Sequence, residues 1–258
     1  MSWKKQSEES SYMMSVSDIM SGLMFIFIIT LAIFVIDFLI ASREHEEKMQ
    51  ELTQILEKLD ENNQMRGAML TDMQEALAKR SIEVDIDIEH GVLRLNENAI
   101  RFTTGSADLR GEQLERLEVV AEVLSEILPC YGSNQPDNGK CLEETRGKID
   151  SVFIEGHTDN VPIGGRLANR YKDNWELSAD RAMFTYREIA KSQPILISMQ
   201  NVNAQPVISV SGYGEGRPVP GHEYAYPKSD PINRRIDFRF IMTPPTATDV
   251  EHALEGNL

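Results

Sequence analysis

A long apolar segment near the start of the chain is the strongest feature of its hydrophobic pattern. From Ile19 to Ile36 there are 18 consecutive uncharged, mostly apolar residues, and residues 38–41 continue the segment after Asp37. At a rise of about 1.5 Å per residue, a helix of this length crosses a hydrocarbon core of roughly 30 Å. The pattern predicts a single transmembrane helix over residues 15–41, preceded by a polar cytoplasmic tail over residues 1–14.

A cleaved signal peptide is the alternative interpretation of this segment. Glu8 and Glu9 are unlike the basic start of a signal peptide, and "FLIASREHEE" contains no small-x-small cleavage site. A retained signal anchor is therefore expected. Lysines and arginines are nearly balanced on the two sides of the span, so they discriminate little between the two orientations.

A second periodic stretch follows the apolar segment. The recurring positions, at alternating steps of three and four, are Met49, Leu52, Leu56, Leu59, Asn63, Arg66, Leu70, Met73 and Leu77. This spacing is the a/d seam of a coiled coil and predicts a helical stalk over residues 42–80. The seam fits two arrangements equally well: a homodimer in which Asn63 fixes the register, or a single helix that packs on the globular domain.

From residue 81 the pattern changes to one typical of an α/β domain. Ile82, Val84, Ile86 and Ile88 alternate before a turn at His90-Gly91, which predicts a hairpin. The later expected elements are a helix over 110–128, a strand over 151–156, a helix over 175–192, a strand over 206–214 and a strand over 234–242. The order is βαβαββ-like and predicts a mixed sheet with helices on one face over residues 81–242. Residues 243–258 are expected to form a loose tail.

Charge and cysteine content limit the possible binding partners and the possible cellular compartment of the chain. The formal net charge is −15, from 41 acidic and 26 basic residues, which argues against direct nucleic-acid binding. Cys130 and Cys141 are the only cysteines, and they flank the turn-rich insert "CYGSNQPDNGKC" without the spacing of a zinc site. A disulfide there would contribute about 3 kcal/mol and requires an oxidising compartment, whereas two unpaired thiols would suit the cytosol. We expect the disulfide, a cytoplasmic N-terminus and a domain outside the inner membrane.

Four short motifs in the second half carry a family resemblance. They are "IEGHTDNVP" (154–162), "NWELSADRA" (174–182), "GYGEGRP" (212–218) and "NRRIDF" (233–238). The set resembles the C-terminal peptidoglycan-binding domain of the OmpA family, and the "NWELS" form looks most like the MotB family of flagellar stator subunits. The resemblance covers about residues 91–241 and implies an OmpA-like fold that binds peptidoglycan.

The candidate binding residues lie in the first two motifs. Asp159 follows a predicted strand, and Arg181 lies one turn past Ser178 on the next helix, so both can reach one rim of the domain. A carboxylate and a guanidinium suit a zwitterion such as diaminopimelate of the peptidoglycan stem. The resemblance implies that Asp159 binds its ammonium and Arg181 its carboxylate, that Asn174 lines the pocket and that Thr158 is a further candidate. The alternative is a surface ion pair of little energetic value between Asp159 and Arg181.

Other polar residues give no sign of catalysis. His157 has no second histidine or cysteine at ligand spacing and no accompanying nucleophile motif, so we expect a structural hydrogen-bonding role. Arg234 and Arg235 either touch peptidoglycan carboxylates or are solvated. We therefore predict a protein that is not an enzyme and that uses no cofactor and no metal.

Asp18 is an ionisable residue at the start of the predicted span. A charged side chain at membrane depth costs about 2.5 to 3.5 kcal/mol on insertion scales, and such residues usually carry function. Ser21 and Gly22 follow at i+3 and i+4, which lets a neighbouring helix approach Asp18 closely. The alternative is that Ser15, Ser17 and Asp18 only cap the start of the helix.

The stretch "SDIMSGLMFIFII" adds a second resemblance. It is similar to the B-subunit span of the MotA/MotB, TolQ/TolR and ExbB/ExbD ion-driven motors, in which the matching aspartate carries the proton. This implies that Asp18 carries the transported ion, a proton or alternatively sodium, within a ring of MotA-like subunits. Ser17, Ser21 and Gly22 depart from the flagellar pattern, and the chain looks more like ZorB, the stator subunit of Zorya anti-phage systems, with a ZorA-type partner. A flagellar stator subunit and a passive OmpA-like wall tether are the alternative functions.

Overall fold

The computed structural model describes residues 3–95, 97, 99–102, 106–134, 136 and 139–245, without the side chains of residues 3–16 and of Arg166. The chain divides into two compact units, with the boundary between Glu57 and Lys58. Most of the tail that was predicted over residues 243–258 lies outside the described residues. The boundary falls within the predicted stalk, so the second half of the stalk belongs to the globular unit.

The first helix, α1 (Trp3–Lys79), contains the predicted span. Its residues from Ser17 to Ala41 are exposed along their whole length, and in the described part of the chain it is the helix long and apolar enough to cross a membrane. The segment expected to be a tail is helical from Trp3. The helix begins more than three turns before Asp18, so Asp18 is a residue in the middle of the helix and not at its start. The capping interpretation is therefore wrong.

The predicted seam on α1 divides into two parts. The fully buried residues near its end are Met69, Leu70, Met73 and Leu77, and they belong to the core of the globular unit. Met49 and Leu56, in contrast, are 50% and 64% exposed. The second half of the seam therefore packs on the domain, as the single-helix arrangement requires, while the apolar residues of the first half are largely exposed.

A five-stranded mixed sheet forms the centre of the globular unit, as predicted. The strands are β1 (Asp85–Asp87), β2 (Val92–Leu95), β3 (Ile149–Gly156), β4 (Ile208–Gly212) and β5 (Ile236–Met242). Their spatial order is β1-β2-β5-β3-β4, with β3 and β4 parallel and the other pairs antiparallel. Both strands of the hairpin join the sheet, so the order along the chain is ββαβαββ rather than βαβαββ.

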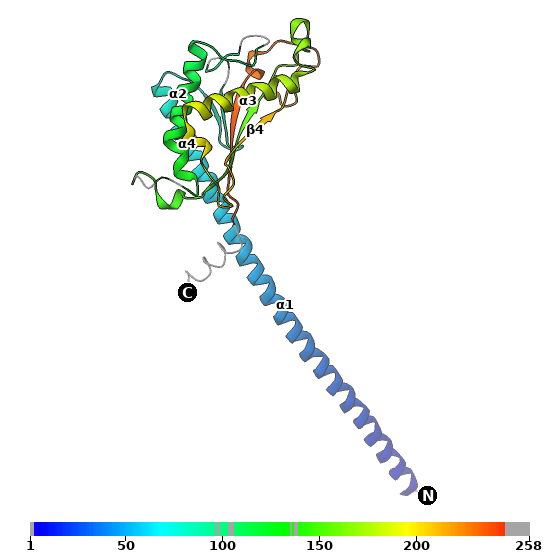
Figure 1. Ribbon diagram of the computed structural model, residues 1–258. Helices are drawn as coiled ribbons and strands as arrows, with labels where there is room; N and C mark the ends of the chain where they lie inside the picture. Colours follow the sequence, from blue (N-terminus) through cyan, green and yellow to red (C-terminus); the bar gives the residue numbers. More distant parts are fainter. Residues whose placement is uncertain are drawn as a thin grey trace. The chain divides into compact units, whose positions relative to one another are not determined.

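The helices cover one face of this sheet because its strands direct apolar side chains to that face and polar side chains to the other. Ile236, Phe238 and Phe240 of β5 are buried in the apolar core, whereas Asp237 and Arg239 point to the opposite face. The end of α1 contributes to the same core, as do α2 (Glu112–Ile127) and α3 (Asn174–Ser192), which lie along one side of the sheet in Figure 1. A single turn of helix, α4 (Pro194–Ile197), follows α3.

The cysteine loop lies between α2 and β3. Pro129 ends α2 in a short 3₁₀ turn, Leu128–Tyr131, which contains the first cysteine. Cys130 and Cys141 form a disulfide bond in the structure, with Cα atoms 5.1 Å apart. Thr145 donates a hydrogen bond to the carbonyl of Cys130 at 2.9 Å, so the end of the loop is also held to its beginning without the disulfide.

The packing of α1 predicts different costs for two methionines of the same seam. Met73→Ala should lower the free energy of unfolding by about 2 to 5 kcal/mol, because it empties a fully buried position. Met49→Ala should change it by less than about 0.5 kcal/mol, since that side chain is half exposed. Urea unfolding of the full chain in detergent measures both. A Met73→Ala effect that depends on protein concentration would instead place Met73 in a dimer seam.

Candidate functional site

The ends of β3 and β4 provide the base of the candidate site. Gly156 and Gly212 are paired in the parallel register, and α3 crosses directly over both. A Cβ on Gly156 would collide with the carbonyl oxygen of Ser178, and a Cβ on Gly212 would lie 2.6 Å from the amide of Ala179. The two glycines thus let the α3 backbone rest on the strand ends, which brings the residues after β3 next to the first turns of α3.

Hydrogen bonds fix the loops that leave these strand ends. The side chain of Asp173 caps α3 by accepting from the amide of Glu176 at 3.0 Å. The Ser178 hydroxyl accepts from the amide of Gly214 at 2.9 Å, and the amide of Thr158 donates to the carbonyl of Gly214 at 2.9 Å. The loop after β3, the loop after β4 and the start of α3 are therefore locked together.

A pocket of about 140 Å³ opens between these segments. Its lining residues are Thr158, Asp159, Val161, Pro162, Ile163, Leu167, Asn174, Leu177, Arg181, Ser229 and Arg234. All four binding residues expected from the sequence line it. The structure thus brings together Thr158 and Asp159 after β3 with Asn174 and Arg181 of α3.

Asp159 forms an ion pair in this pocket, but with a different arginine than the sequence suggested. Its Oδ2 accepts from Arg234 Nη1 at 2.6 Å and from the amide of Asp230 at 3.2 Å. Its Oδ1 accepts from the amide of Val161 at 3.3 Å. No ion pair with Arg181 occurs among the described side chains, and only 8% of Asp159 is exposed, so a surface pair of Asp159 with Arg181 is not what the structure contains.

Arg181 is buried with its terminal nitrogens still available. It is 2% exposed, its Nε donates to the carbonyl of Ser106 at 3.1 Å, and its guanidinium carbon lies 5.0 Å from the ring centre of Phe102. Burial, assisted by the charge of Arg234, lowers the pKa of Arg181 to about 10, so the side chain stays protonated at neutral pH. Among the described residues its two Nη atoms have no hydrogen-bond partner, and the residue lines the pocket.

Asn174 and Thr158 play different parts. The Asn174 amide donates to the carbonyls of Asp159 at 3.3 Å and Val161 at 3.0 Å, so it shapes the loop that carries the acid. The Thr158 hydroxyl is buried and has no hydrogen-bond partner within the described part of the chain. Because a buried hydroxyl without a partner is unfavourable, Thr158 is the better placed of the two to bind a ligand.

The charges at the pocket are balanced. Arg234 pairs with Asp159 and also with Glu97, whose Oε1 lies 2.7 Å from Arg234 Nη2, and its Nη1 donates to the Ser229 hydroxyl at 2.7 Å. Two acids therefore accompany Arg234 and Arg181. Sequence reasoning missed the role of Arg234 as the partner of Asp159, because the two lie 75 residues apart and only the pairing of β3 with β5 brings them close.

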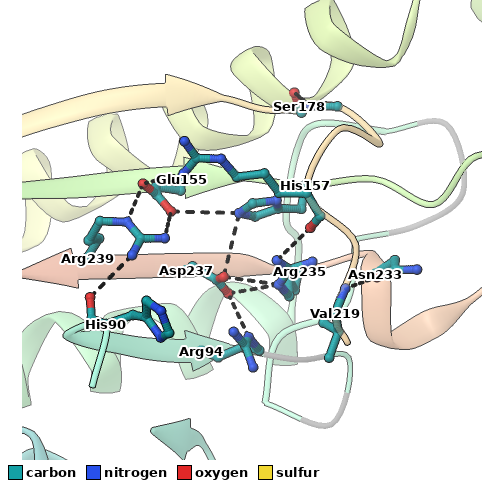
Figure 2. A network of polar contacts seen from close by, with 12 residues as sticks. His90, Arg94, Glu155, His157, Ser178, Val219, Asn233, Arg235, Asp237 and Arg239 are labelled. Atoms are coloured by element: carbon teal, nitrogen blue, oxygen red, sulfur yellow. Dashed lines mark hydrogen bonds and ion pairs between the residues drawn. The ribbon is translucent and has the colours of Figure 1, made fainter. Parts of the chain in front are cut away.

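A buried polar network lies on the face of the sheet that the helices leave open (Figure 2). Glu155, His157 and Asp237 have ligand atoms within 4.8 Å of one another, as in a metal site. The two carboxylates are already paired, however: Glu155 accepts two hydrogen bonds from Arg239 at 2.8 and 2.9 Å, and Asp237 accepts from Arg235 at 3.0 and 3.1 Å. With guanidinium groups in these positions, we interpret the cluster as a structural ion-pair network.

His157 holds the centre of this network. Its Nε2 lies 3.5 Å from Asp237 Oδ2 and 3.9 Å from Glu155 Oε2, longer than ordinary hydrogen bonds, and its ring stacks on Tyr213. Burial lowers the pKa of His157 and outweighs the effect of the two carboxylates. Burial alone would raise the pKa of Glu155, but contacts with His157 and Arg239 lower it to about 2. The expected hydrogen-bonding role of His157 is thus replaced by packing and electrostatics.

Comparisons with known proteins agree with the resemblance in the motifs. No model of a known protein family matches the chain. Motility protein B of Bacillus subtilis strain 168 is 30% identical over 147 residues, which are 57% of this chain and 44% of that protein. Motility protein B of Escherichia coli strain K12 is 25% identical over 147 residues, 57% of this chain and 38% of that protein. The chain thus spans less than half the length of the curated relatives that it matches.

Solved structures give a weaker likeness. The crystal structure of a putative MotB-like protein from Desulfovibrio vulgaris is 19% identical, with a TM-score of 0.47, over 71% of this chain and 98% of that one. At this level of similarity the likeness carries no functional argument, and the assignment of a function depends on the site itself.

The burial of His157 predicts a loss of stability at mildly acidic pH. The unfolded chain takes up a proton near pH 6.5, whereas the folded chain resists it, so the unfolded state binds more protons as the pH falls. Between pH 7.5 and 5.5 this group should lower the free energy of unfolding of the wild type by up to about 1.4 kcal/mol per pH unit. Urea unfolding of His157→Gln across the same range should show a smaller slope. Equal slopes for the wild type and His157→Gln would contradict the prediction, because they would mean that His157 takes up a proton as readily in the folded chain as in the unfolded one.

Proposed function

We propose that this chain is a peptidoglycan-anchored B subunit of a MotA/MotB-like, ion-driven motor in the bacterial inner membrane. The observation that carries the proposal is the convergence of Asp159 and Arg181 in one pocket. The sequence similarity to motility protein B and the exposed apolar helix support it. In this arrangement α1 crosses the membrane once, with its N-terminus in the cytoplasm and the pocket in the periplasm, where a disulfide is stable.

The ligand of the pocket is the diaminopimelate stem of peptidoglycan. The carbon of diaminopimelate that bears both an ammonium and a carboxylate presents opposite charges side by side. The carboxylate accepts from the Nη atoms of Arg181, which have no partner among the described residues, and the ammonium approaches Asp159. Arg234 already holds Asp159, so the ammonium must share this carboxylate with a guanidinium that Glu97 also binds.

The ion carrier is Asp18. Its side chain is exposed on α1, and apart from the nearby backbone of α1 and the two chain neighbours of Gly22, no described atom lies within 4 Å of where a Cβ on Gly22 would be. The surface beside Asp18 is therefore open to a neighbouring helix. A ring of MotA-like subunits, ZorA-type in a defence system, supplies that helix. A proton taken up by the carboxylate removes its charge, and each charge that crosses the membrane is worth about 2.3 kcal/mol per 100 mV. Sodium is the alternative ion.

A homodimer and a role in anti-phage defence complete the proposal. The exposed first half of the seam, with Met49 and Leu56, offers an apolar stripe to a second copy. The departures at Ser17, Ser21 and Gly22 favour a Zorya-type stator subunit over a flagellar one. Neighbouring genes distinguish the two: a flagellar operon supports motility, and genes for large effector proteins support defence.

Loss of either charged group in the pocket should abolish wall binding. In a pull-down with purified peptidoglycan, Asp159→Ala and Arg181→Ala should each lower retention about tenfold or more, because each removes a charged hydrogen bond to the ligand. Arg187→Ala, a change of an exposed arginine on the same helix, serves as the control and should bind normally. Retention of both pocket variants at the wild-type level would refute the site.

Removal of the carboxylate at position 18 should separate the motor from the wall anchor. Asp18→Asn should abolish ion-dependent activity, measured as protection from phage or as motility, while peptidoglycan retention stays unchanged. Asp37→Asn is the matched control, because Asp37 lies near the other edge of the apolar segment and should tolerate the change. A fully active Asp18→Asn variant would leave only the passive wall tether.

A further inference from the structure

The segment His222 to Asp230 forms a rigid strap beside the pocket. The Asn160 amide donates to the carbonyls of Tyr224 and Tyr226, both at 2.9 Å, and its oxygen accepts from the amide of Lys228 at 2.8 Å. All three of these bonds hold the strap, and Asn160 directly follows Asp159 in the chain. The strap is thus fixed to the loop that carries the pocket's acid.

A second set of contacts ties the far end of the strap to the same acid. The amide of Asp230 donates to Asp159 Oδ2 at 3.2 Å, and the Asp230 carboxylate pairs with His222 Nδ1 at 2.8 Å. Hydrogen bonding to His222 helps to keep the pKa of Asp230 low against the opposing effect of burial. Between these anchors the backbone has few ways to move, although most of its side chains are exposed.

Two tyrosines stand on this strap. Tyr226 is 64% exposed, and its ring centre lies 6.4 Å from that of Tyr224, at an interplanar angle of 45°. Lys228 Nζ lies 3.9 Å from the ring centre of Tyr224 and occupies one face of that ring. An exposed aromatic ring on a backbone held by three side-chain hydrogen bonds is costly to leave in water, and it is pre-organised to bind a flat, partly apolar ligand.

We propose that Tyr226, with Tyr224 and Lys228, forms a binding platform for the glycan strand of peptidoglycan. The inference rests on the proposed function of the pocket and extends it from the peptide to the sugar. The C–H groups of an N-acetylated pyranose ring form an apolar face that stacks on an aromatic ring, and its hydroxyl and acetamido oxygens accept hydrogen bonds from an ammonium such as that of Lys228.

The reach of the two ligand parts matches. Ser229 lines the pocket, and Tyr226 lies three residues before it, so their Cα atoms are at most about 11 Å apart. Diaminopimelate is the third residue of the stem and binds through the free end of its side chain, so up to roughly 20 Å of flexible chain links the bound group to the sugar that bears the stem. A stem held by Asp159 and Arg181 therefore carries its sugar within range of Tyr226.

Two soluble ligands distinguish binding at the platform from binding at the pocket. One is the diaminopimelate-containing stem tetrapeptide alone, and the other is the same tetrapeptide on its N-acetylglucosaminyl-N-acetylmuramyl disaccharide. Isothermal titration of the full chain in detergent should show about fivefold tighter binding of the disaccharide form. Tyr226→Ala should remove this difference and leave the affinity for the tetrapeptide unchanged, whereas Tyr226→Trp should keep it.

Leu142→Ala, a change of a 63% exposed apolar residue directly after the disulfide loop, should affect neither ligand. An unchanged preference for the disaccharide in Tyr226→Ala, or an equal loss for both ligands, would overturn the platform. Equal affinities of the wild type for the two ligands would also overturn it while leaving the pocket intact. Failure of the tetrapeptide to bind would count against the pocket itself.

Discussion

Close contact between the α3 backbone and the ends of β3 and β4 is the constraint on which the site depends. The contact is possible because Gly156 and Gly212 carry no side chain, and any Cβ at either position would meet α3 backbone atoms. Only with α3 at this distance does the hydroxyl of Ser178 reach the amide of Gly214. Arg181 lies one helical turn further along and is thereby placed in the same pocket as Asp159.

The same strand ends connect the pocket to the network on the open face of the sheet. His157 lies two residues before Asp159, and Arg234 and Arg235 are adjacent, so each of the two segments contributes one charged residue to the pocket and another to the network. The amide of His157 donates to the carbonyl of Arg235 at 3.0 Å and holds the two segments together. Ion pairs buried on one face thus fix the backbone from which Asp159 and Arg234 reach the other side.

Sequence patterns were sufficient for the main helices and strands, the hairpin and four of the residues that line the pocket. Alternation and helical spacing report which face of each element is buried, and the motif resemblance indicated Asp159 and Arg181. The patterns could not reveal that Arg234 holds Asp159, or that Asp237 and Glu155 surround His157, because these contacts depend on the antiparallel pairing of β3 with β5. They also left the seam of α1 open, since an apolar stripe looks the same whether it faces a domain or a second helix.

The way in which the seam divides limits the reach of the proposed wall anchor. Because α1 from Lys58 onward is part of the globular unit, and Met73 and Leu77 are fully buried in its core, this half of the predicted stalk cannot extend without exposing the core. Residues 42–57 are then the connection between the span and the domain. They reach about 24 Å as a helix and at most about 58 Å when fully extended. Under the proposed function, a pocket that holds peptidoglycan while Asp18 lies in the membrane works within that distance, which favours an anchor close to the membrane surface over a long, flexible tether.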